Sequence, residues 1–340
     1  MKLDTVKWGI IGCGNVTEKK NGPPLYKTPH SELVAVMRRN GKLAADYAKR
    51  HGAARWYDHA DKLINDPEVN AVYIATPPNT HAQYAIQAMR AGKPVYVEKP
   101  MARTYAECQE MVRVSEETGV PLFVAYYRRA LPLFVKVKEL LDQGVIGKPL
   151  AVNIRFYRPN KELTQAGDQL SWRVLPEIAG GGLFYDLASH KLDFLDYLFG
   201  PIENVQGTAS NVGGIYPAED TVAASFEFAN GVLGTGSWSF FADAASIEDT
   251  IEILGTEGKL WFACFDPVKL TLRTQKGDVF FNFDPPEHVG GNLIQLVVDH
   301  LRGEGSCPSS GASAERTNWV MEEIVKSYYE KVASQHNNKD

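Results

Sequence analysis

Two polar side chains, four residues apart, suit the movement of a proton to or from a bound hydroxyl group. In a helix that begins near Gly182, Asp186 and His190 lie on one face, and Asp193 and Tyr197 continue the same polar stripe. Because an imidazole titrates near neutral pH, His190 can act as a general base while Asp186 orients the ring and stabilises imidazolium. An ordinary amphipathic helix with an exposed Asp–His pair has the same spacing, so this motif alone leaves both interpretations open.

A glycine-rich turn follows the first run of β-branched residues and has the spacing of a phosphate-binding loop. Gly12 fits the position where the chain bends sharply, and Gly14 the position where the backbone approaches a pyrophosphate. Asn15 and Val16 then begin a helix whose N–H groups would face that phosphate, and Thr17 stands where a third small residue packs helix on strand. The turn therefore predicts a dinucleotide site.

The end of the second predicted strand indicates which dinucleotide this is. NAD-specific proteins place a carboxylate there to bind the ribose 2′-hydroxyl, whereas this chain has Arg38 and Arg39. Two guanidinium groups can hold a 2′-phosphate by charge-assisted hydrogen bonds, so NADP(H) is favoured. NAD(H) stays possible, because the arginines could instead solvate a surface loop, or Arg38 could stack on the adenine ring.

Two loops that each follow a predicted strand bring further polar groups to the carboxyl edge of the sheet, where open α/β folds bind their ligands. One reads Thr-Pro-Pro-Asn-Thr-His and the other Glu-Lys-Pro. Lys99 would face the crevice, donate to a substrate oxygen and stabilise developing alkoxide charge. The residues of these loops that we expect to contact the dinucleotide are Thr76, Pro77, Asn79, His81, Glu98 and Lys99.

These motifs resemble, over nearly the whole chain, the family of glucose–fructose oxidoreductase, inositol dehydrogenase and rhizopine catabolism proteins, called Gfo/Idh/MocA. The resemblance rests on the glycine turn, both loops just described and the run from Gly180 to His190. It implies hydride transfer between a nicotinamide and a CH–OH or C=O group of a sugar, cyclic polyol or related diol. It also implies a cis Lys99–Pro100 bond and a catalytic group of Lys99, Asp186 and His190. Some members of the family carry tyrosine at the position of His190. The histidine here resembles the inositol-dehydrogenase-like and sugar-dehydrogenase-like branches.

The resemblance also implies contacts by residues outside these motifs. Tyr127, Trp172 and Arg173 stand at places that touch the nicotinamide half or the substrate, and Tyr127 is assigned to the substrate. Trp172 and Arg173, assigned to the cofactor, could equally be packing and a surface ion pair. Tyr157, on a strand expected to face the same cleft, is a further candidate for the substrate.

Two other functions could use the same features. A non-catalytic regulator could use the fold to sense nucleotide, although such proteins can lose the catalytic group that is present here. An oxidoreductase could also keep its nicotinamide bound and recycle it between two substrates, as glucose–fructose oxidoreductase does.

The open sheet face of the family commonly forms a subunit interface, which predicts a homodimer or homotetramer. The alternating apolar positions that would allow it are Val222, Ala224, Phe226, Phe228, Val232, Trp238 and Phe240.

Positioning these groups requires an α/β fold in two domains. Residues 1–125 alternate short β-rich runs with helical stretches, which predicts an NADP-binding Rossmann domain with a doubly wound parallel sheet. Residues 126–340 have longer strands at hairpin spacing, which predicts a substrate-binding and oligomerisation domain of α+β type with a large, mainly antiparallel open sheet. Its C-terminal helix could pack back on the first domain.

The predicted elements are as follows. The strands of the first domain are Val6–Ile11, Glu32–Arg38, Ala71–Ala75, Pro94–Glu98 and Leu122–Ala125, and its helices are Gly41–His51, His59–Asp66, His81–Ala91 and Tyr105–Thr118. Helices of the second domain are Gly182–Phe199, Leu293–Arg302 and Ala314–Ala333.

Composition argues against several other classes of protein. The 340 residues carry a formal net charge of -5 at pH 7, with scattered lysines and arginines, so we expect neither nucleic acid nor a membrane as a partner. The chain has no signal-like start and no run of about 18 apolar residues, which predicts a cytoplasmic protein. Cys13, Cys108, Cys264 and Cys307 lie far apart, so we expect buried, reduced thiols and neither a metal site nor disulfides.

Overall fold

A six-stranded parallel sheet forms the centre of the first of two units in the computed structural model, which describes residues 2–159, 164–166 and 169–337. The strand order is β3-β2-β1-β4-β5-β6, so the order reverses between β1 and β4, the position at which ligands bind in such sheets. The strands are β1 (Val6–Ile11), β2 (Ser31–Met37), β3 (Arg55–Tyr57), β4 (Ala71–Ile74), β5 (Val95–Val97) and β6 (Leu122–Val124). This confirms the predicted Rossmann domain; β3 was missed because it is a short edge strand with little buried surface.

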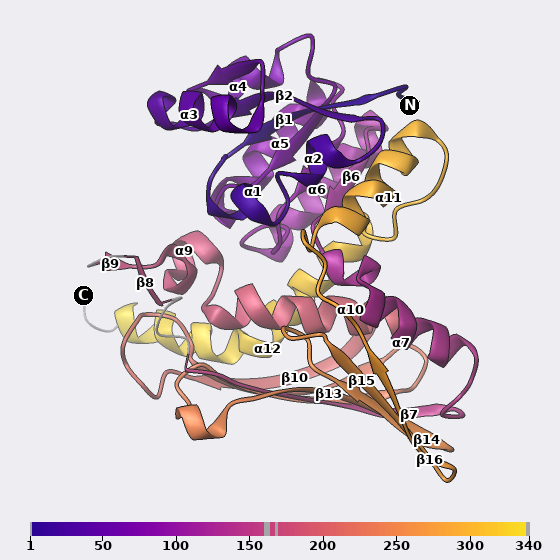
Figure 1. The fold of residues 1–340 in the computed structure, drawn as a ribbon. Helices are drawn as coiled ribbons and strands as arrows, with labels where there is room; N and C mark the ends of the chain where they lie inside the picture. Colours follow the sequence, from indigo (N-terminus) through magenta and orange to yellow (C-terminus); the bar gives the residue numbers. More distant parts are fainter. Residues whose placement is uncertain (1, 160–163, 167–168, 338–340) are drawn as a thin grey trace. The chain divides into compact units, whose positions relative to one another are not determined.

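Helices cover both faces of this sheet (Figure 1). They are α1 (Asn15–Lys19), α2 (Pro24–Lys27), α3 (Gly41–His51), α4 (Ala60–Ile64), α5 (His81–Arg90), α6 (Tyr105–Thr118) and α11 (Gly291–Arg302). The core with α4, α5 and α6 lies on one face, and the core with α2, α3 and α11 lies on the other. Alternate residues of β1 therefore pack into different cores, as strand geometry requires.

The first unit consists of Met1–Leu131 and Pro286–Glu315, and the second of Pro132–Pro285 and Arg316–Asp340. The expected single division after residue 125 differs from this arrangement. The late segment belongs to the first unit because the apolar side of α11, which includes Leu293 and Val297, completes a core on the parallel sheet.

The second unit contains an eight-stranded sheet in the order β10-β11-β12-β7-β13-β14-β15-β16. All neighbours are antiparallel except β12 and β7, so the predicted mainly antiparallel sheet is confirmed. The strands are β7 (Pro149–Tyr157), β10 (Ile202–Ser210), β11 (Thr221–Phe228), β12 (Leu233–Ser239), β13 (Glu248–Gly255), β14 (Gly258–Phe262), β15 (Lys269–Thr274) and β16 (Gly277–Asn282). Two short strands, β8 (Gln165–Ala166) and β9 (Gln169–Leu170), pair separately.

Helices α10 (Ser189–Phe199) and α12 (Gly311–Asn337) lie along one face of this sheet (Figure 1). The unit also contains α7 (Pro132–Asp142) and the short α9 (Pro176–Ala179). The face they cover contains the apolar residues that we expected at a subunit interface, and six of these are buried within the chain itself: Val222, Phe226, Phe228, Val232, Trp238 and Phe240. Those residues form the core and do not indicate an interface. The homodimer or homotetramer stays a prediction, and these six residues no longer support it.

Among the helices of the described residues, none combines the length and the apolar character needed to cross a membrane.

Candidate active site

The glycine turn leaves space beside its backbone. Gly12 has a φ of +94°, and a Cβ on it would lie 2.9 Å from the backbone nitrogen of Thr76. A Cβ on Gly14 would instead meet its nearest neighbour, the carbonyl oxygen of Gly12, at 3.8 Å. Gly12 is therefore required by the protein's own packing, whereas the space at Gly14 remains open for a ligand to approach the backbone.

Thr17 closes the glycine turn by hydrogen bonds, which is more than the packing role expected of it. It is fully buried, and its hydroxyl accepts from the Gly14 N–H at 3.0 Å and donates to the Gly14 carbonyl at 2.8 Å. The following helix α1 has only five residues. A pyrophosphate at this turn would therefore meet open space and a closely bonded backbone, and not the start of a long helix.

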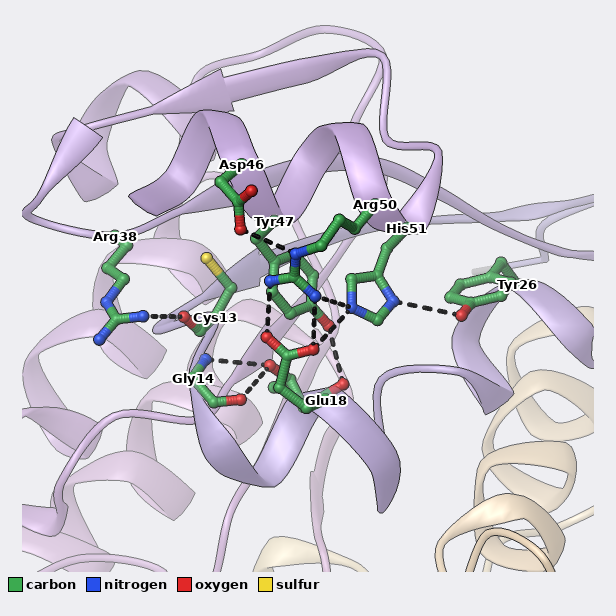
Figure 2. Close-up of polar contacts among 10 residues, drawn as sticks. Cys13, Gly14, Glu18, Tyr26, Arg38, Asp46, Tyr47, Arg50 and His51 are labelled. Carbon is green, nitrogen blue, oxygen red and sulfur yellow. Dashed lines mark hydrogen bonds and ion pairs between the residues drawn. The ribbon is translucent and has the colours of Figure 1, made fainter. Parts of the chain in front are cut away.

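The arginine pair lies at the end of β2, and both side chains are exposed. Figure 2 shows Arg38 directed at the glycine turn, where its Nη1 donates to the carbonyl of Cys13 at 3.4 Å. Cys13 itself is buried, and that burial raises the pKa of its thiol to about 11. A thiol held neutral in this way is a packing group and a poor nucleophile, as expected.

An ion-pair network lies between α1, which follows the turn, and α3 (Figure 2). The guanidinium of Arg50 donates to both carboxylate oxygens of Glu18 at 2.8 Å each, and His51 Nε2 lies 3.0 Å from the same carboxylate. These hydrogen bonds, those of Arg50 first, lower the pKa of Glu18 to about 2. Tyr47 donates to the Thr17 carbonyl at 2.8 Å. The network joins α1 to α3, and sequence reasoning missed it.

Glu98 is buried next to Lys99. Its Oε1 accepts from Asn21 at 2.5 Å and from Tyr73 at 2.6 Å, and its Oε2 accepts from the Lys99 backbone N–H at 3.2 Å. The Lys99–Pro100 peptide is cis, as the family resemblance implied. The carboxylate of Glu98, which we had assigned to the cofactor, thus anchors the backbone that presents Lys99.

His81 joins the two loops at the sheet edge from the inside. The ring is fully buried, with Nε2 2.7 Å from the Thr76 carbonyl and Nδ1 3.1 Å from the Pro100 carbonyl. Burial lowers the pKa of His81, which favours the neutral ring, and a neutral ring donates to only one of these two carbonyls. A wholly buried imidazole supports the loops of Thr76 and Lys99 but is not placed for the direct cofactor contact that we expected of it.

The segment that carries Asp186 and His190 is not a uniform α-helix. Residues Phe184–Ala188 form a π-helical turn and α10 begins at Ser189. A π turn adds a residue, so the four-residue spacing does not place the two side chains as it would in an α-helix. His190 is only 3 % exposed. The alternative of an ordinary helix with an exposed Asp–His pair is therefore wrong.

Asp186 forms an ion pair with Arg173 in the second unit, where Oδ2 lies 3.2 Å from Arg173 Nε. The Arg173 guanidinium also lies 4.4 Å from the centre of the Trp172 ring. The Trp172-Arg173 pair is thus connected to Asp186, one of the predicted catalytic residues. The sequence had left open whether these two residues bind the cofactor or form only packing and a surface ion pair.

Two tyrosines were candidates for the substrate. Tyr127 lies in a 3₁₀ turn after β6, half-buried, with the guanidinium of Arg128 5.1 Å from its ring centre. The hydroxyl of Tyr157 bonds to Ser237 Oγ at 2.6 Å. Its neighbour Phe156 is buried beneath α10, and because successive strand residues alternate, Tyr157 points to the other face of the sheet from His190. The expected substrate role of Tyr157 does not fit this placement.

Glu219 is a residue that sequence reasoning missed. It is fully buried, accepts from the Gly182 N–H at 2.8 Å and receives the hydroxyl of Tyr329 at 2.5 Å. Burial outweighs these hydrogen bonds and raises the pKa of Glu219 to about 7. It links the glycine run before Asp186 to the C-terminal helix. A carboxyl at the start of an apolar strand was a signal, but its partners lie far away in sequence.

Comparisons with protein families agree with this architecture. Residues 6–126 match the model described as "Oxidoreductase family, NAD-binding Rossmann fold", and residues 134–261 match the "GFO/IDH/MocA C-terminal domain". Together these matches cover most of the chain. The protein is an oxidoreductase with a nucleotide-binding Rossmann unit, and it belongs to the Gfo/Idh/MocA family.

Several relatives extend over most of the chain. Oxidoreductase P35 of Formosa agariphila is 38% identical over 93% of this chain and 97% of its own length. Levoglucosan dehydrogenase of Pseudarthrobacter phenanthrenivorans is 29% identical over 90% of this chain and 84% of its own. Bovine (Bos taurus) trans-1,2-dihydrobenzene-1,2-diol dehydrogenase is 29% identical over 79% of this chain and 78% of its own. A 1,5-anhydro-D-fructose reductase of Ensifer adhaerens is 29% identical over 93% of this chain and 93% of its own. Because these relatives are named as oxidoreductases, dehydrogenases and a reductase, an enzyme is supported over a non-catalytic regulator.

A solved structure of levoglucosan dehydrogenase with NADH and levoglucosan shares the fold. Its TM-score is 0.86, with 24% identity, 96% of this chain covered and 97% of that chain. Both units of the present protein thus have counterparts in a known enzyme fold.

Proposed function

We propose that this protein is an NADP(H)-dependent oxidoreductase that transfers a hydride between the nicotinamide and a CH–OH or C=O group of a sugar, cyclic polyol or related diol. The observation that carries the cofactor assignment is the exposed arginine pair at the end of β2, beside a glycine turn with open space at Gly14. Relatives that are named for levoglucosan, 1,5-anhydro-D-fructose and a dihydrobenzenediol support the substrate class.

The residues present fit a dinucleotide. The turn at Gly12 and Gly14 leaves room for a pyrophosphate, and Arg38 and Arg39 supply positive charge for a 2′-phosphate where an NAD-specific protein would have a carboxylate. Asn15, Val16, Thr76, Pro77 and Asn79, and from the second unit Trp172 and Arg173, complete the proposed set of cofactor contacts. When bound, the nicotinamide supplies the hydride acceptor for oxidation and the hydride donor for reduction.

Lys99, Asp186 and His190 are the proposed catalytic group. In oxidation the substrate O–H bond breaks and His190 takes the proton while a hydride leaves the carbon, and in reduction His190 returns that proton. The Lys99 ammonium donates to the reacting oxygen and stabilises alkoxide charge. Asp186 carries a negative charge near this chemistry, balanced by Arg173. Tyr127 is the proposed additional substrate contact.

Cofactor preference is tested by fluorescence titration with NADPH and NADH at one moderate salt concentration. We expect NADPH to bind at least about tenfold more tightly, and the variant R38A/R39A to lose most of that difference while it keeps its NADH affinity. Arg90, which is exposed on α5 outside the proposed site, provides the matched control R90A. Equal affinities for both nucleotides in the native protein would refute the assignment.

The catalytic group is tested with levoglucosan, 1,5-anhydro-D-fructose and trans-1,2-dihydrobenzene-1,2-diol as probes. On the probe that is turned over fastest, K99M and H190A should each lower kcat by about 10²–10⁴-fold with NADPH affinity retained. Undiminished turnover in both variants would overturn the proposal. Nicotinamide absorbance that survives extensive dialysis would identify the alternative, an enzyme that retains and recycles its cofactor, and light scattering would test the predicted homodimer or homotetramer.

A further inference from the structure

A lysine is buried beside His190. The side chain of Lys191 is 0% exposed in α10 and forms an ion pair with Asp249 of β13. Its Nζ lies 4.6 Å from the centre of the Phe156 ring and 5.8 Å from that of Phe265. Aromatic rings favour a cation over their faces, and the Asp249 carboxylate supplies the negative charge that pairs with the buried ammonium.

Asp249 also fixes the segment that follows β14. One of its carboxylate oxygens, Oδ2, accepts from the backbone N–H of Cys264 at 3.1 Å and from that of Phe265 at 2.7 Å, while Oδ1 faces Lys191. The Phe265 ring then meets His190 edge-on, with centres 5.8 Å apart and planes at 79°. Phe156 packs against the same ring at 5.0 Å. One carboxylate thus anchors the ring that the imidazole of His190 touches.

We infer that Asp249 is a positioning residue for His190 that acts through Phe265, and that Lys191 is the buried counter-charge of Asp249. This rests on the proposed function in one respect, the role of His190 in proton transfer. Asp249 does not touch the reacting atoms in this arrangement. It fixes the backbone of Phe265, and the ring limits the orientations open to the imidazole.

Energetics supports a positioning role over a purely stabilising one. The Lys191 side chain is fully buried and that of Asp249 is 18% exposed. Removing such charges from water costs about as much as their attraction returns, so the pair adds little net stability compared with an apolar pair of similar size. Orientation is a different matter, because a displacement of about 1 Å in a catalytic group can cost on the order of 10²-fold in rate. The two backbone hydrogen bonds, and not the ion pair itself, are what set the position of Phe265.

The decisive comparison uses two double variants that both remove the charges of Lys191 and Asp249. K191M/D249L also removes the acceptor for the two N–H groups, whereas K191M/D249N keeps an amide oxygen for them. We expect the first to lower kcat by about 10–100-fold with the KM for NADPH within about twofold, and the second to stay within a few-fold of the native kcat. R316M/D196L removes another α10 ion pair, at 3.0 Å, and is the matched control whose kcat should not change.

NMR of the ¹³C-labelled histidine rings gives a readout that needs no substrate. The His190 ring protons, assigned with H190Q, should shift in K191M/D249L and in F265L because the ring current of Phe265 moves or disappears, and they should keep their positions in K191M/D249N and in the R316M/D196L control. F265L, which keeps the ion pair, decides the matter if K191M/D249L fails to fold.

The two proposals fail in different ways. Native His190 ring signals and native kcat in F265L, or equal losses in both double variants, would overturn the positioning role while H190A remains inactive. Full turnover in H190A would instead overturn the catalytic role of His190, and with it the kinetic part of this inference, even if the NMR shifts appear as expected.

Discussion

Gly14 in the first glycine turn and Gly182 in the second are glycines for opposite reasons. In the first unit, a Cβ on Gly14 would have no neighbour closer than 3.8 Å, so the turn is open at this residue. In the second unit, a Cβ on Gly182 would lie 2.6 Å from the backbone oxygen of Glu219, so the protein itself occupies the space. Gly14 leaves open space at the position where we propose that the dinucleotide binds, whereas Gly182 makes room for the chain itself.

Each turn also has a glutamate beside it, and the two glutamates differ in exposure and in pKa. Glu18 beside the first turn is 34% exposed and is held by Arg50 and His51, which lower its pKa to about 2. Glu219 beside the second turn is fully buried without a cation among its hydrogen-bond partners Gly182 and Tyr329, and burial raises its pKa to about 7. A partly exposed charge network can therefore support a loop with little desolvation cost, whereas the buried carboxyl makes the stability of the folded protein depend on pH near neutrality.

The largest effect expected from this contrast is the pH dependence due to Glu219. Because its folded pKa of about 7 lies above the reference value of 4.5, the folded state binds the extra proton between these values, so stability falls as the pH rises through that window. The full difference is about 3 kcal/mol as an order of magnitude. E219Q should lose this slope and gain stability relative to the native protein at pH 8.

Urea denaturation of both proteins at pH 5 and pH 8 measures that change, since other titrating groups are common to both. Parallel pH profiles for E219Q and the native protein would contradict the pKa shift of Glu219.

A second prediction breaks the contrast between the turns. G182A places a methyl group 2.6 Å from a backbone oxygen, which cannot move aside as a flexible side chain could. We expect a loss of about 2 kcal/mol in stability. The thermal midpoint, followed by circular dichroism with G14A as the matched control, checks this, and an equal midpoint for both variants would show that the second turn has more room than the structure shows.

G14A should act on binding instead of on folding. The methyl group fits beside the protein's own atoms but occupies the space through which, in the proposed binding mode, a pyrophosphate reaches the backbone. We expect NADPH affinity to fall by about tenfold, equivalent to about 1.4 kcal/mol, with a native thermal midpoint. Fluorescence titration measures the affinity, and unchanged affinity would place the dinucleotide elsewhere.

The smallest effect is expected at the exposed network. E18Q removes a pair that is partly open to solvent, so the loss in stability should be below about 1 kcal/mol and should shrink in high salt. Because the pKa of Glu18 is lowered to about 2, its contribution is present at neutral pH and is lost as the pH falls from the reference value of 4.5 through about 2. Thermal midpoints at low and high salt test this, and a loss as large as that of G182A would mean that exposure does not separate the two regions.

Local sequence patterns predicted the first unit well. The strand Val6–Ile11 and the helices Gly41–His51 and Tyr105–Thr118 have the predicted bounds, because glycines or capping residues mark their ends. The antiparallel pair of β11 and β12 is a hairpin of the kind that the strand spacing of the second domain predicted. By contrast, the central strand β7 was expected only around Tyr157, without bounds. The edge strand β10 was not predicted, because its sequence is mostly polar or small and most of its residues are exposed or half-buried.

By itself the sequence determined the fold class, the glycine turn and the residue types available for chemistry, because these depend on neighbours within a few positions. Only the tertiary structure decided that Glu219 meets Tyr329, that Asp249 holds Phe265 against His190, and that Tyr157 faces away. Such pairings follow from strand order and register, which join residues that are far apart in the chain and cannot be derived from local periodicity.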